Sequence, residues 1–475
     1  MLVAAFLGTG LWLLRWSGDN ARTTPDTFWY ARDAFRYAGY SAPRAEAIAA
    51  RLTCQGYQRA RPKLTYAGCL RYRTNLPRSA PIRFQRIFTS RPGYALSTVP
   101  FVWVFGRAGF AIGSAVLGVA CGVAIVVLAL AAGMRLIQAF LAEILFYLLP
   151  TGLWASRLLA EAPMMLCLIV SLIGAVLLLR GHGRLSERGR PSERDWLGRL
   201  RERARLRRLG GLGRFDGLGG PGGRVRELVA VSLLAAGLIW LCVVKPANGV
   251  ALAAVMAGMA VVCLPYARVR RAYLVIAAVA AVVLAGNLLV SAVLRLPGVH
   301  ETLQDAFTRH FHKPDVSDPW RRLAVRNLKL LAGRIGPQLI NHPFIVATYV
   351  FAAVGLFRRL RLATAGLLSL AGLTGAMVIA MHPITSEIAR LTVVTWIPVA
   401  LGLVAFVGPL ARRRTGPPRV LSGGVDEVTG LGETVAPSPA LPGRVSGVAV
   451  DVPPGARNVP GDISSSRADR QDLDR

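Results

Sequence analysis

The sequence predicts an all-α integral membrane protein with about ten transmembrane helices and two long extracytoplasmic loops. The chain has 475 residues, of which 53% are hydrophobic, and its mean hydropathy of +0.45 is too high for a soluble multidomain protein. Polar connections separate ten apolar segments, and basic clusters fall in every second connection. Because basic loops stay on the cytoplasmic face of a bilayer, this alternation predicts a polytopic topology.

The basic clusters also assign a side to each loop. They are Arg180 to Arg226, then Arg268, Arg270 and Arg271, then Arg358, Arg359 and Arg361, and finally Arg412 to Arg414. The polar loops 17–108 and 295–341 therefore face the extracytoplasmic side together, and 181–226 is a basic cytoplasmic loop. Any chemistry is expected on the extracytoplasmic face.

We expect the polytopic membrane domain to cover 1–411. Its apolar segments are approximately 1–14, 109–134, 136–150, 159–179, 227–244, 249–265, 272–294, 342–357, 362–381 and 391–411. The first is shorter than the roughly 20 residues that cross a bilayer, and we interpret it as the end of a spanning helix. Segments 136–150 and 342–357 are short enough to be re-entrant, so the sequence predicts nine to eleven spans.

The C-terminal tail and the basic loop 181–226 are expected to be cytoplasmic. Residues 412–475 are rich in Pro, Gly, Ser, Asp and Arg, and they predict a disordered tail because they bury too little apolar surface to fold. Within the basic loop, Trp196 to Leu209 forms either a solvated linker or a helix on anionic headgroups. The predicted location is the plasma membrane.

The net charge of +32 would indicate nucleic-acid binding in a soluble protein. Here nearly all the cations are arginines, and many lie in short cytoplasmic loops or in the tail, where topology explains them. The sequence has no fold signature for nucleic-acid binding and no interleaving of aromatic and basic residues. We therefore expect membrane lipids as partners and no nucleic acid.

The cysteines fall into two groups. Cys54 and Cys69 lie in the first extracytoplasmic loop, where an oxidising compartment would let them form a disulfide. The other four lie inside apolar segments and are expected to pack there: Cys121, Cys167, Cys242 and Cys263.

The second long loop contains groups that invite a metal site. His310, His312, Asp315 and Asp318 are close in sequence, but no third strong ligand has a recognisable spacing. We therefore predict no metal site and no required cofactor, although a divalent metal is chemically possible. The following stretch, Trp320 to Ile335, predicts an amphipathic surface helix.

Asp26 is the first candidate for chemistry. Thr24-Pro25-Asp26 predicts a helix start with an N-cap, a proline at the first position and an acid in the first turn. Trp29 and Tyr30 follow in an aromatic stretch typical of an interfacial helix, and Gly39 can end it. Asp26 is either a general base for an incoming hydroxyl or a partner of the helix dipole.

Two arginines are candidates for binding an anion. Arg91 lies in Ser90-Arg91-Pro92-Gly93-Tyr94, just before an apolar stretch, and Arg390 lies before the last apolar segment. Arginine grips phosphate through a planar, multi-donor fork. The alternatives are an interfacial anchor for Arg91 and an i,i+3 pair with Glu387 for Arg390.

Carboxylates at the membrane edge need a partner or a role. Arg157 and Glu161 are four residues apart, so on one helix they would share a face and pair. Glu143, deeper in its apolar segment, raises the same question.

Together these fragments resemble the GT-C class of polytopic glycosyltransferases, which includes protein O-mannosyltransferase-like enzymes. The resemblance covers about the first 180 residues and beyond them rests on topology. It depends on the order of Asp26 with Trp29-Tyr30, Ser90-Arg91-Pro92-Gly93-Tyr94, Ser156-Arg157 with Glu161, and Arg390. The chain departs from the class in its short first segment, its lack of an Asp-Glu pair and its Gly93, where a bulkier apolar residue is usual.

The resemblance implies an inverting transfer of a sugar from a polyprenyl-phosphate donor to an extracytoplasmic acceptor. In that hypothesis Asp26 removes the acceptor proton, and Arg91 or Arg390 stabilises the charge on the departing phosphate. Trp29, Tyr30, Tyr94, Arg157 and Glu161 support the site. The alternatives are a catalytically inactive GT-C-like membrane scaffold and, after it, a lipid or solute transporter, for which the spans offer few polar residues.

Overall fold

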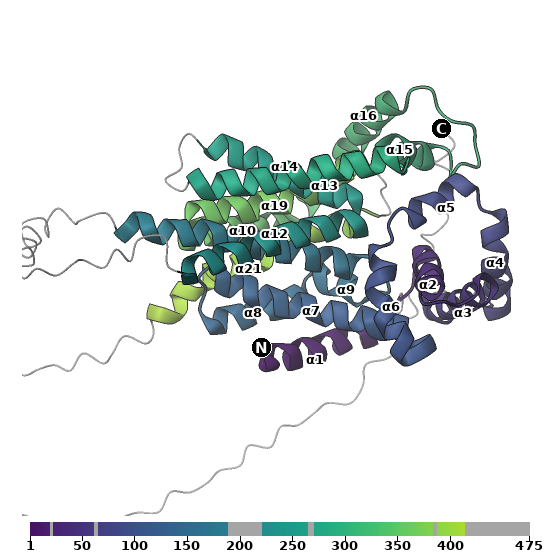
Figure 1. Cartoon of the computed structure of the whole chain (residues 1–475), viewed down its shortest axis with the longest axis horizontal. Helices are drawn as coiled ribbons and strands as arrows, with labels where there is room; N and C mark the ends of the chain where they lie inside the picture. The colour runs from purple at the N-terminus through teal and green to yellow at the C-terminus, as the bar shows by residue number, and fades with distance from the viewer. Residues whose placement is uncertain (20–21, 61–64, 189–220, 265–269, 383–386, 414–475) are drawn as a thin grey trace, which may run out of the picture. The chain divides into compact units, whose positions relative to one another are not determined.

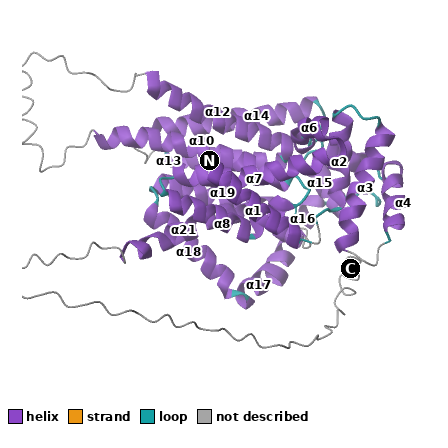
Figure 2. Cartoon of the chain, turned by 90° about the horizontal axis from the view of Figure 1, so that it is seen from below, coloured by secondary structure: helices purple, strands orange, loops and turns teal. Residues whose placement is uncertain are grey.

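The computed structural model describes residues 1–19, 22–60, 65–188, 221–264, 270–382 and 387–413 (Figure 1). Every regular element in these ranges is helical (Figure 2). The predicted all-α class is therefore confirmed for the part of the chain that the structure describes. The stretch Trp196 to Leu209, for which the sequence left a linker and a surface helix open, and the tail beyond 413 lie outside the described residues.

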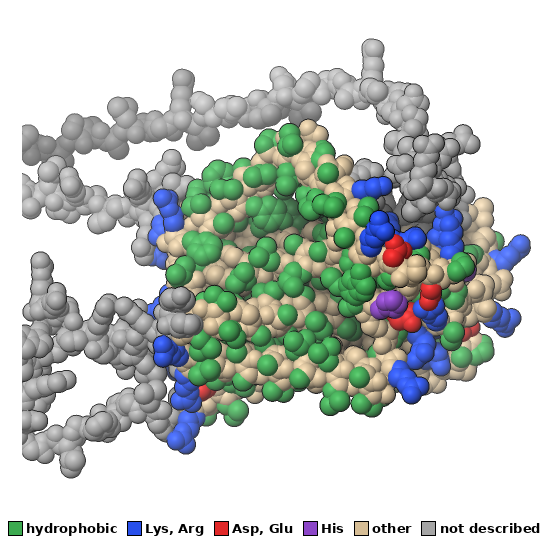
Figure 3. Space-filling model, turned by 90° about the horizontal axis from the view of Figure 1, so that it is seen from above, with side chains coloured by type: hydrophobic (Ala, Val, Ile, Leu, Met, Phe, Trp, Pro, Cys, Tyr) green, Lys and Arg blue, Asp and Glu red, His purple; other side chains and the backbone are tan. Residues whose placement is uncertain are grey.

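Long apolar helices pack side by side as a bundle (Figure 1). They are α1 (Leu2–Gly18), α7 (Gly109–Ala131), α8 (Leu136–Leu148), α10 (Glu161–Arg188), α12 (Pro221–Val244), α13 (Pro246–Cys263), α14 (Arg270–Val293), α18 (Pro343–Arg359), α19 (Leu362–Met381) and α21 (Trp396–Arg413). Apolar side chains cover the sides of this bundle, and lysines and arginines gather toward its ends (Figure 3). A membrane protein needs such an apolar belt, because lipid tails surround its middle.

Six helical segments in the described ranges are long and apolar enough to cross a membrane. They are Gly93–Ala131, Glu161–Arg180, Arg224–Val244, Pro246–Cys263, Arg270–Val293 and Leu362–Met381. The first contains α6 (Gly93–Phe105) as well as α7, so the apolar stretch begins earlier than the expected 109. This supports a multi-pass membrane protein, while the expected ten spans are not reached by length and composition.

The two short segments that the sequence marked as re-entrant are the two broken helices. Leu136–Leu148 meets α9 (Pro150–Ser156) at 69°, and Pro319–Asn341 meets Pro343–Arg359 at 81°. Counting each pair as one span gives up to eight. The remaining two predicted segments correspond to the shorter apolar helices Leu2–Gly18 and Val393–Val407.

The basic clusters that the structure describes lie at one end of the bundle. α12 runs from exposed Arg224 and Arg226 to buried Lys245, which follows its last residue. Antiparallel neighbours then place Arg270 and Arg358 at the same end as the start of α12, because each chain reversal returns there. The periodic arginines of the sequence therefore mark a common end of the bundle.

The two long loops fold into helices that meet at the opposite end (Figure 1). The first forms α2 (Pro25–Tyr37), α3 (Ala42–Ala60), α4 (Tyr66–Ser79) and α5 (Ile82–Thr89), and the second forms α15 (Val299–Phe307), α16 (Pro319–Leu330), the π-helical turn η3 (Leu331–Ile335) and α17 (Gly336–Asn341). Arg83 of α5 joins the loops through Glu301 at 2.7 Å and Asp315 at 2.9 Å. The two long loops therefore contact each other at this end of the bundle, and their extracytoplasmic side stays a prediction.

The start of the first loop has the local structure that the sequence predicts. Thr24 caps α2 with Pro25 at its first position, and Gly39 adopts a φ of +95° beyond the helix end. Further along, a disulfide joins Cys54 of α3 to Cys69 of α4. In the second loop, α16 occupies most of the predicted helix and exposes Trp320.

Helices α18 and α21 approach each other closely in the bundle. A Cβ atom on Gly402 would lie 2.7 Å from the carbonyl carbon of Ala352, and one on Gly355 would lie 2.7 Å from the backbone nitrogen of Phe406. Small residues permit such an approach between membrane helices, where van der Waals packing drives association.

We expect Gly402→Ala to destabilise the fold by about 1–3 kcal/mol, because the new methyl group overpacks the contact. Thermal unfolding of the detergent-purified protein measures this as a lower Tm. The matched control is Gly366→Ala on α19, where no atom lies within 4 Å of the added Cβ. That change should leave the Tm unchanged or raise it, and equal losses in both variants would contradict the packing argument.

Candidate functional site

Arg390 joins two carboxylates at the end of the bundle where the two long loops meet. It lies on α20 (Ile388–Leu391) with 9% of its side chain exposed. Its Nη1 donates to Oδ2 of Asp26 at 2.7 Å, and its Nε donates to Oε1 of Glu161 at 2.5 Å. The structure thus brings together three residues that the sequence singled out, two of them 364 positions apart.

Lys245 completes this group, which we call the charge cluster: Asp26, Glu161, Lys245 and Arg390. Its Nζ donates to the same Oε1 of Glu161 at 2.6 Å, and only 11% of its side chain is exposed. Oε2 of Glu161 is buried and accepts no hydrogen bond from the part of the chain that the structure describes. One carboxylate oxygen therefore holds two cations, and the other remains available to a ligand or a water molecule.

Hydrogen bonds between α2 and the segment before α10 place two of these acids together. Thr27 Oγ1 donates to the carbonyl of Leu158 at 2.9 Å, and the Leu158 amide donates to the carbonyl of Arg22 at 3.0 Å. Asp26 and Glu161 each lie in the first turn of their helix, where the dipole favours negative charge. Two helix N-termini thus meet at the charge cluster.

The aromatic residues that the sequence predicted as supporting residues pack α2, the helix that carries Asp26, against its neighbours. Trp29 stacks on Phe88 with ring centroids 5.6 Å apart, and Tyr30 contacts Tyr94 edge-to-face at 5.3 Å. Tyr94 in turn exchanges a 2.6 Å hydrogen bond with Ser114 of α7. Burial and then the charge of Asp26 raise the pKa of Tyr30, so its hydroxyl stays protonated. These contacts fix α2 against α5 and α6.

Arg91 lies between α5 and α6 and is half-buried. Among the described residues its guanidinium makes no hydrogen bond or ion pair. The charge of Arg91 nevertheless affects His382. The burial of His382 and, second in size, the positive charge of Arg91 lower the pKa of His382 to about 4, so its imidazole is neutral at physiological pH. The Nδ1 atom of His382 is buried and has no hydrogen-bond partner among the described residues.

Glu387 is a third carboxylate at the edge of the cluster. Its Oε1 lies 3.7 Å from Nη1 of Arg390, so the i,i+3 pair considered from the sequence exists but is longer than the contacts to Asp26 and Glu161. Burial raises the pKa of Glu387, an effect that Arg390 opposes.

The pairing of Arg157 with Glu161 is wrong. Arg157 precedes α10 in extended backbone, with φ −82° and ψ 153°, so the two side chains do not share a helix face. Its Nε instead donates to Asp19 at 2.7 Å, and its guanidinium lies 4.4 Å from the centroid of the Trp154 ring. Arg157 therefore binds the chain segment before α2 through Asp19 and is not a member of the charge cluster.

Sequence reasoning missed two contributors to this end of the molecule. Lys245 is one of only four lysines and sits between two apolar helices, which is a usable signal because buried cations need partners. Asp305 of α15 contacts His310, with Oδ1 and Nδ1 3.0 Å apart. No group of three His, Cys, Asp or Glu side chains able to hold a metal occurs in the described ranges.

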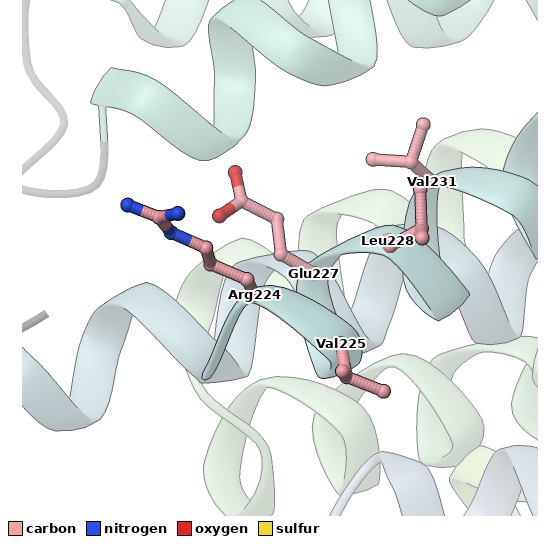
Figure 4. A pocket seen from close by; sticks show the side chains of 5 residues that line it. All are labelled: Arg224, Val225, Glu227, Leu228 and Val231. Carbon is pink, nitrogen blue, oxygen red and sulfur yellow. The ribbon is translucent and has the colours of Figure 1, made fainter. Parts of the chain in front are cut away.

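An open surface cavity of about 420 Å³ lies far from this site, at the first turns of α12 (Figure 4). It is lined by Arg224, Val225, Glu227, Leu228 and Val231. Glu227 pairs with Arg271 at 3.0 Å. The cavity is at the opposite end of α12 from Lys245 and plays no part in the site.

Comparisons with protein-family models, curated proteins and solved structures find no match for this chain. The functional interpretation therefore rests on the residues and their geometry.

Glu161→Ala should cost about 3–5 kcal/mol, because it leaves two buried cations without their carboxylate. Adding Lys245→Met should recover part of this loss by removing one of those cations. Thermal unfolding compares the variants, and Glu227→Ala is the control, since it breaks the pair with largely exposed Arg271 and should cost under about 1 kcal/mol. Equal effects at Glu161 and Glu227 would show that water screens the cluster.

Proposed function

We propose that the protein is a plasma-membrane glycosyltransferase that moves a sugar from a polyprenyl-phosphate donor to an extracytoplasmic acceptor. The acceptor classes are cell-envelope glycans, lipids and proteins. The observation that carries the proposal is the pairing of Asp26 with Arg390 beside Arg91, which places a carboxylate and two cations at one end of an apolar bundle. The resemblance of the sequence to the GT-C class supports the same assignment.

Arg91 suits the donor phosphate, because its guanidinium has no partner among the described residues and lies next to an apolar helix. A polyprenyl chain in the bilayer would bring its phosphate to that level. Arg390 adds charge but is already held by two carboxylates, so its role is to orient Asp26 and stabilise the leaving phosphate.

Asp26 suits the acceptor hydroxyl. Its Oδ2 binds Arg390, its Oδ1 makes no hydrogen bond to a described residue, and 26% of the side chain is exposed. The free oxygen can accept the acceptor O–H while the new bond to the sugar carbon forms and the bond to the phosphate oxygen breaks. The phosphate then leaves with the bonding electrons, opposite the incoming oxygen.

Native mass spectrometry of the detergent-purified protein tests donor binding. We expect a co-purified polyprenyl phosphate that is lost in Arg91→Ala, because the variant removes the free cation while keeping the charge cluster intact. The matched control is Arg71→Ala, an exposed arginine on α4 that should retain the lipid. Asp26→Asn should keep the lipid and reduce sugar transfer by about 100-fold or more.

Two outcomes of these experiments would contradict the proposal in different ways. Absence of the lipid, under conditions that preserve one on a polyprenyl-phosphate enzyme, would favour the inactive scaffold. A folded Asp26→Asn protein with full transfer would remove the role of Asp26.

Transport is a second candidate, favoured by one observation inside the bundle. Glu143 of α8 is fully buried, and within the described ranges neither of its carboxyl oxygens has a hydrogen-bond partner. Cβ atoms on Gly8 or Gly122 would lie 2.8 Å from its Oε1, so these glycines make room for the carboxyl group. An unpaired intramembrane carboxyl group is typical of proton pathways.

If protons cross through Glu143, proteoliposomes loaded with a pH-sensitive dye should acidify under an applied membrane potential. Glu143→Gln should abolish this flux, whereas Glu227→Gln, at a surface position, should leave it unchanged. No flux from the wild-type protein above that of empty vesicles would eliminate the transporter.

A further inference from the structure

The first long loop is strongly basic. Residues 25–89, from which α2 to α5 fold, contain 12 arginines and lysines but only three acids. Two of the acids, Asp26 and Asp33, already form ion pairs with buried arginines. The third acid, Glu46, is partly exposed. We call residues 25–89 the basic lobe, because their positive charge greatly exceeds the negative charge available to neutralise it.

Four exposed arginines carry much of this charge. Arg44 and Arg51 lie on α3, and Arg71 and Arg78 lie on α4. None of the four forms an ion pair with a residue that the structure describes. Within each pair the two positions are seven residues apart, so they share a helix face at a spacing of about 10 Å. Each helix therefore presents a row of two cations to its surroundings.

The two helices that carry these rows stand away from the apolar belt of the bundle. α4 packs on α3, α3 packs on α2, and α2 packs on α6, which continues into the bundle helix α7. Helices α3 and α4 accordingly lie at the outer end of the molecule, beyond the ends of the long helices (Figure 1). Their arginines are therefore placed to meet a partner outside the bilayer.

α3 and α4 also lack the apolar face that a helix on a bilayer surface needs. Among their described side chains, Tyr72 is the only large apolar or aromatic one that is exposed. A helix in the headgroup region buries an apolar face and places cations beside it. α16 has that form, since Trp320 and Leu328 are exposed on the same helix as Arg322 and Lys329. The exposed surface of α3 and α4 instead suits a partner in water.

The chemistry of the surface favours one class of partner. Guanidinium groups bind phosphate and carboxylate through their planar fork, and two rows of them engage several anionic groups of one chain at once. A protein partner would need an apolar centre in its interface, which this surface does not offer in the described residues. Of the acceptor classes considered above, a glycan with repeated negative charges fits best.

We propose that the basic lobe binds an anionic glycan, a polymer with repeated phosphate or carboxylate groups, and holds it as the acceptor. The acceptor role rests on the proposed glycosyl transfer, in which Asp26 on the first helix of the lobe receives the acceptor hydroxyl. The four exposed arginines of α3 and α4 bind the charged groups of the polymer and take no part in making or breaking bonds.

Binding of fluorescent carboxymethyl-dextran to the full-length protein, in nanodiscs of uncharged lipid, tests the surface without any donor. We expect binding that weakens as NaCl is raised, and no binding of unmodified dextran of the same length. The combined variant Arg44→Gln, Arg51→Gln, Arg71→Gln and Arg78→Gln should lower the affinity about 10-fold or more. Its Tm should equal that of the wild-type protein, because all four residues are exposed.

A charge-matched control removes four exposed arginines from the other end of the bundle: Arg224→Gln, Arg226→Gln, Arg358→Gln and Arg359→Gln. This variant has the same net charge as the first and should bind carboxymethyl-dextran as the wild-type protein does. Equal losses in both variants would show that net charge alone attracts the polymer, which would overturn the lobe as its binding surface. Unchanged dextran binding with loss of co-purified anionic phospholipid in the lobe variant would make the lobe a membrane contact and overturn the proposal.

Transfer kinetics test the acceptor role, with an acidic cell-envelope oligosaccharide as the acceptor. The lobe variant should raise the KM for this acceptor about 10-fold and leave kcat unchanged, because the arginines bind the acceptor equally before and during the reaction. An unchanged KM would overturn the acceptor role and leave the proposed function intact. Absence of transfer by the wild-type protein would contradict the proposed function, while the dextran measurement would still decide whether the lobe binds an anionic glycan.

Discussion

Arg390 bridges the carboxylates of Asp26 and Glu161, and the arrangement of this protein depends on these two ion pairs. A guanidinium with 9% of its side chain exposed is tolerated only when its charge is compensated, and two carboxylates from distant parts of the chain provide that compensation. Lys245 shares one of those carboxylates, so the two cations and two acids of the charge cluster form a neutral group. The cluster links the first long loop, α10, the junction of α12 with α13, and α20.

This linkage places the buried ion pairs of the charge cluster at one end of an apolar bundle. The helices that deliver Glu161 and Lys245 to the cluster carry their exposed arginines at the other end. The two long loops are joined to each other through Arg83, which contacts Glu301 and Asp315. Most charged groups of the described residues therefore occupy the two ends, where headgroups and water are available, and Glu143 is an exception inside the bundle.

Local sequence signals predicted much of this architecture because their causes are local. Thr24 and Pro25 define the start of α2 through capping and a fixed φ, and the spacing of arginines reflects the cost of moving charge across a bilayer. The ion-pair partners of the charged residues were less predictable. Arg157 pairs with Asp19, 138 residues away, because the backbone of Arg157 is extended and does not continue the helix of Glu161. The role of Lys245 was missed for the same reason, since only packing reveals its distance from Glu161.

The order of the cluster along the chain has a consequence for biosynthesis. Asp26, Glu161 and Lys245 are all synthesised before Arg390, so the nascent protein can form the pair of Glu161 with Lys245 well before Asp26 has a cation. The second long loop, which contacts Arg83, also precedes Arg390. The segment around α20 is therefore the last piece to enter the site, and its arrival joins the earliest loop of the chain to one of its latest helices.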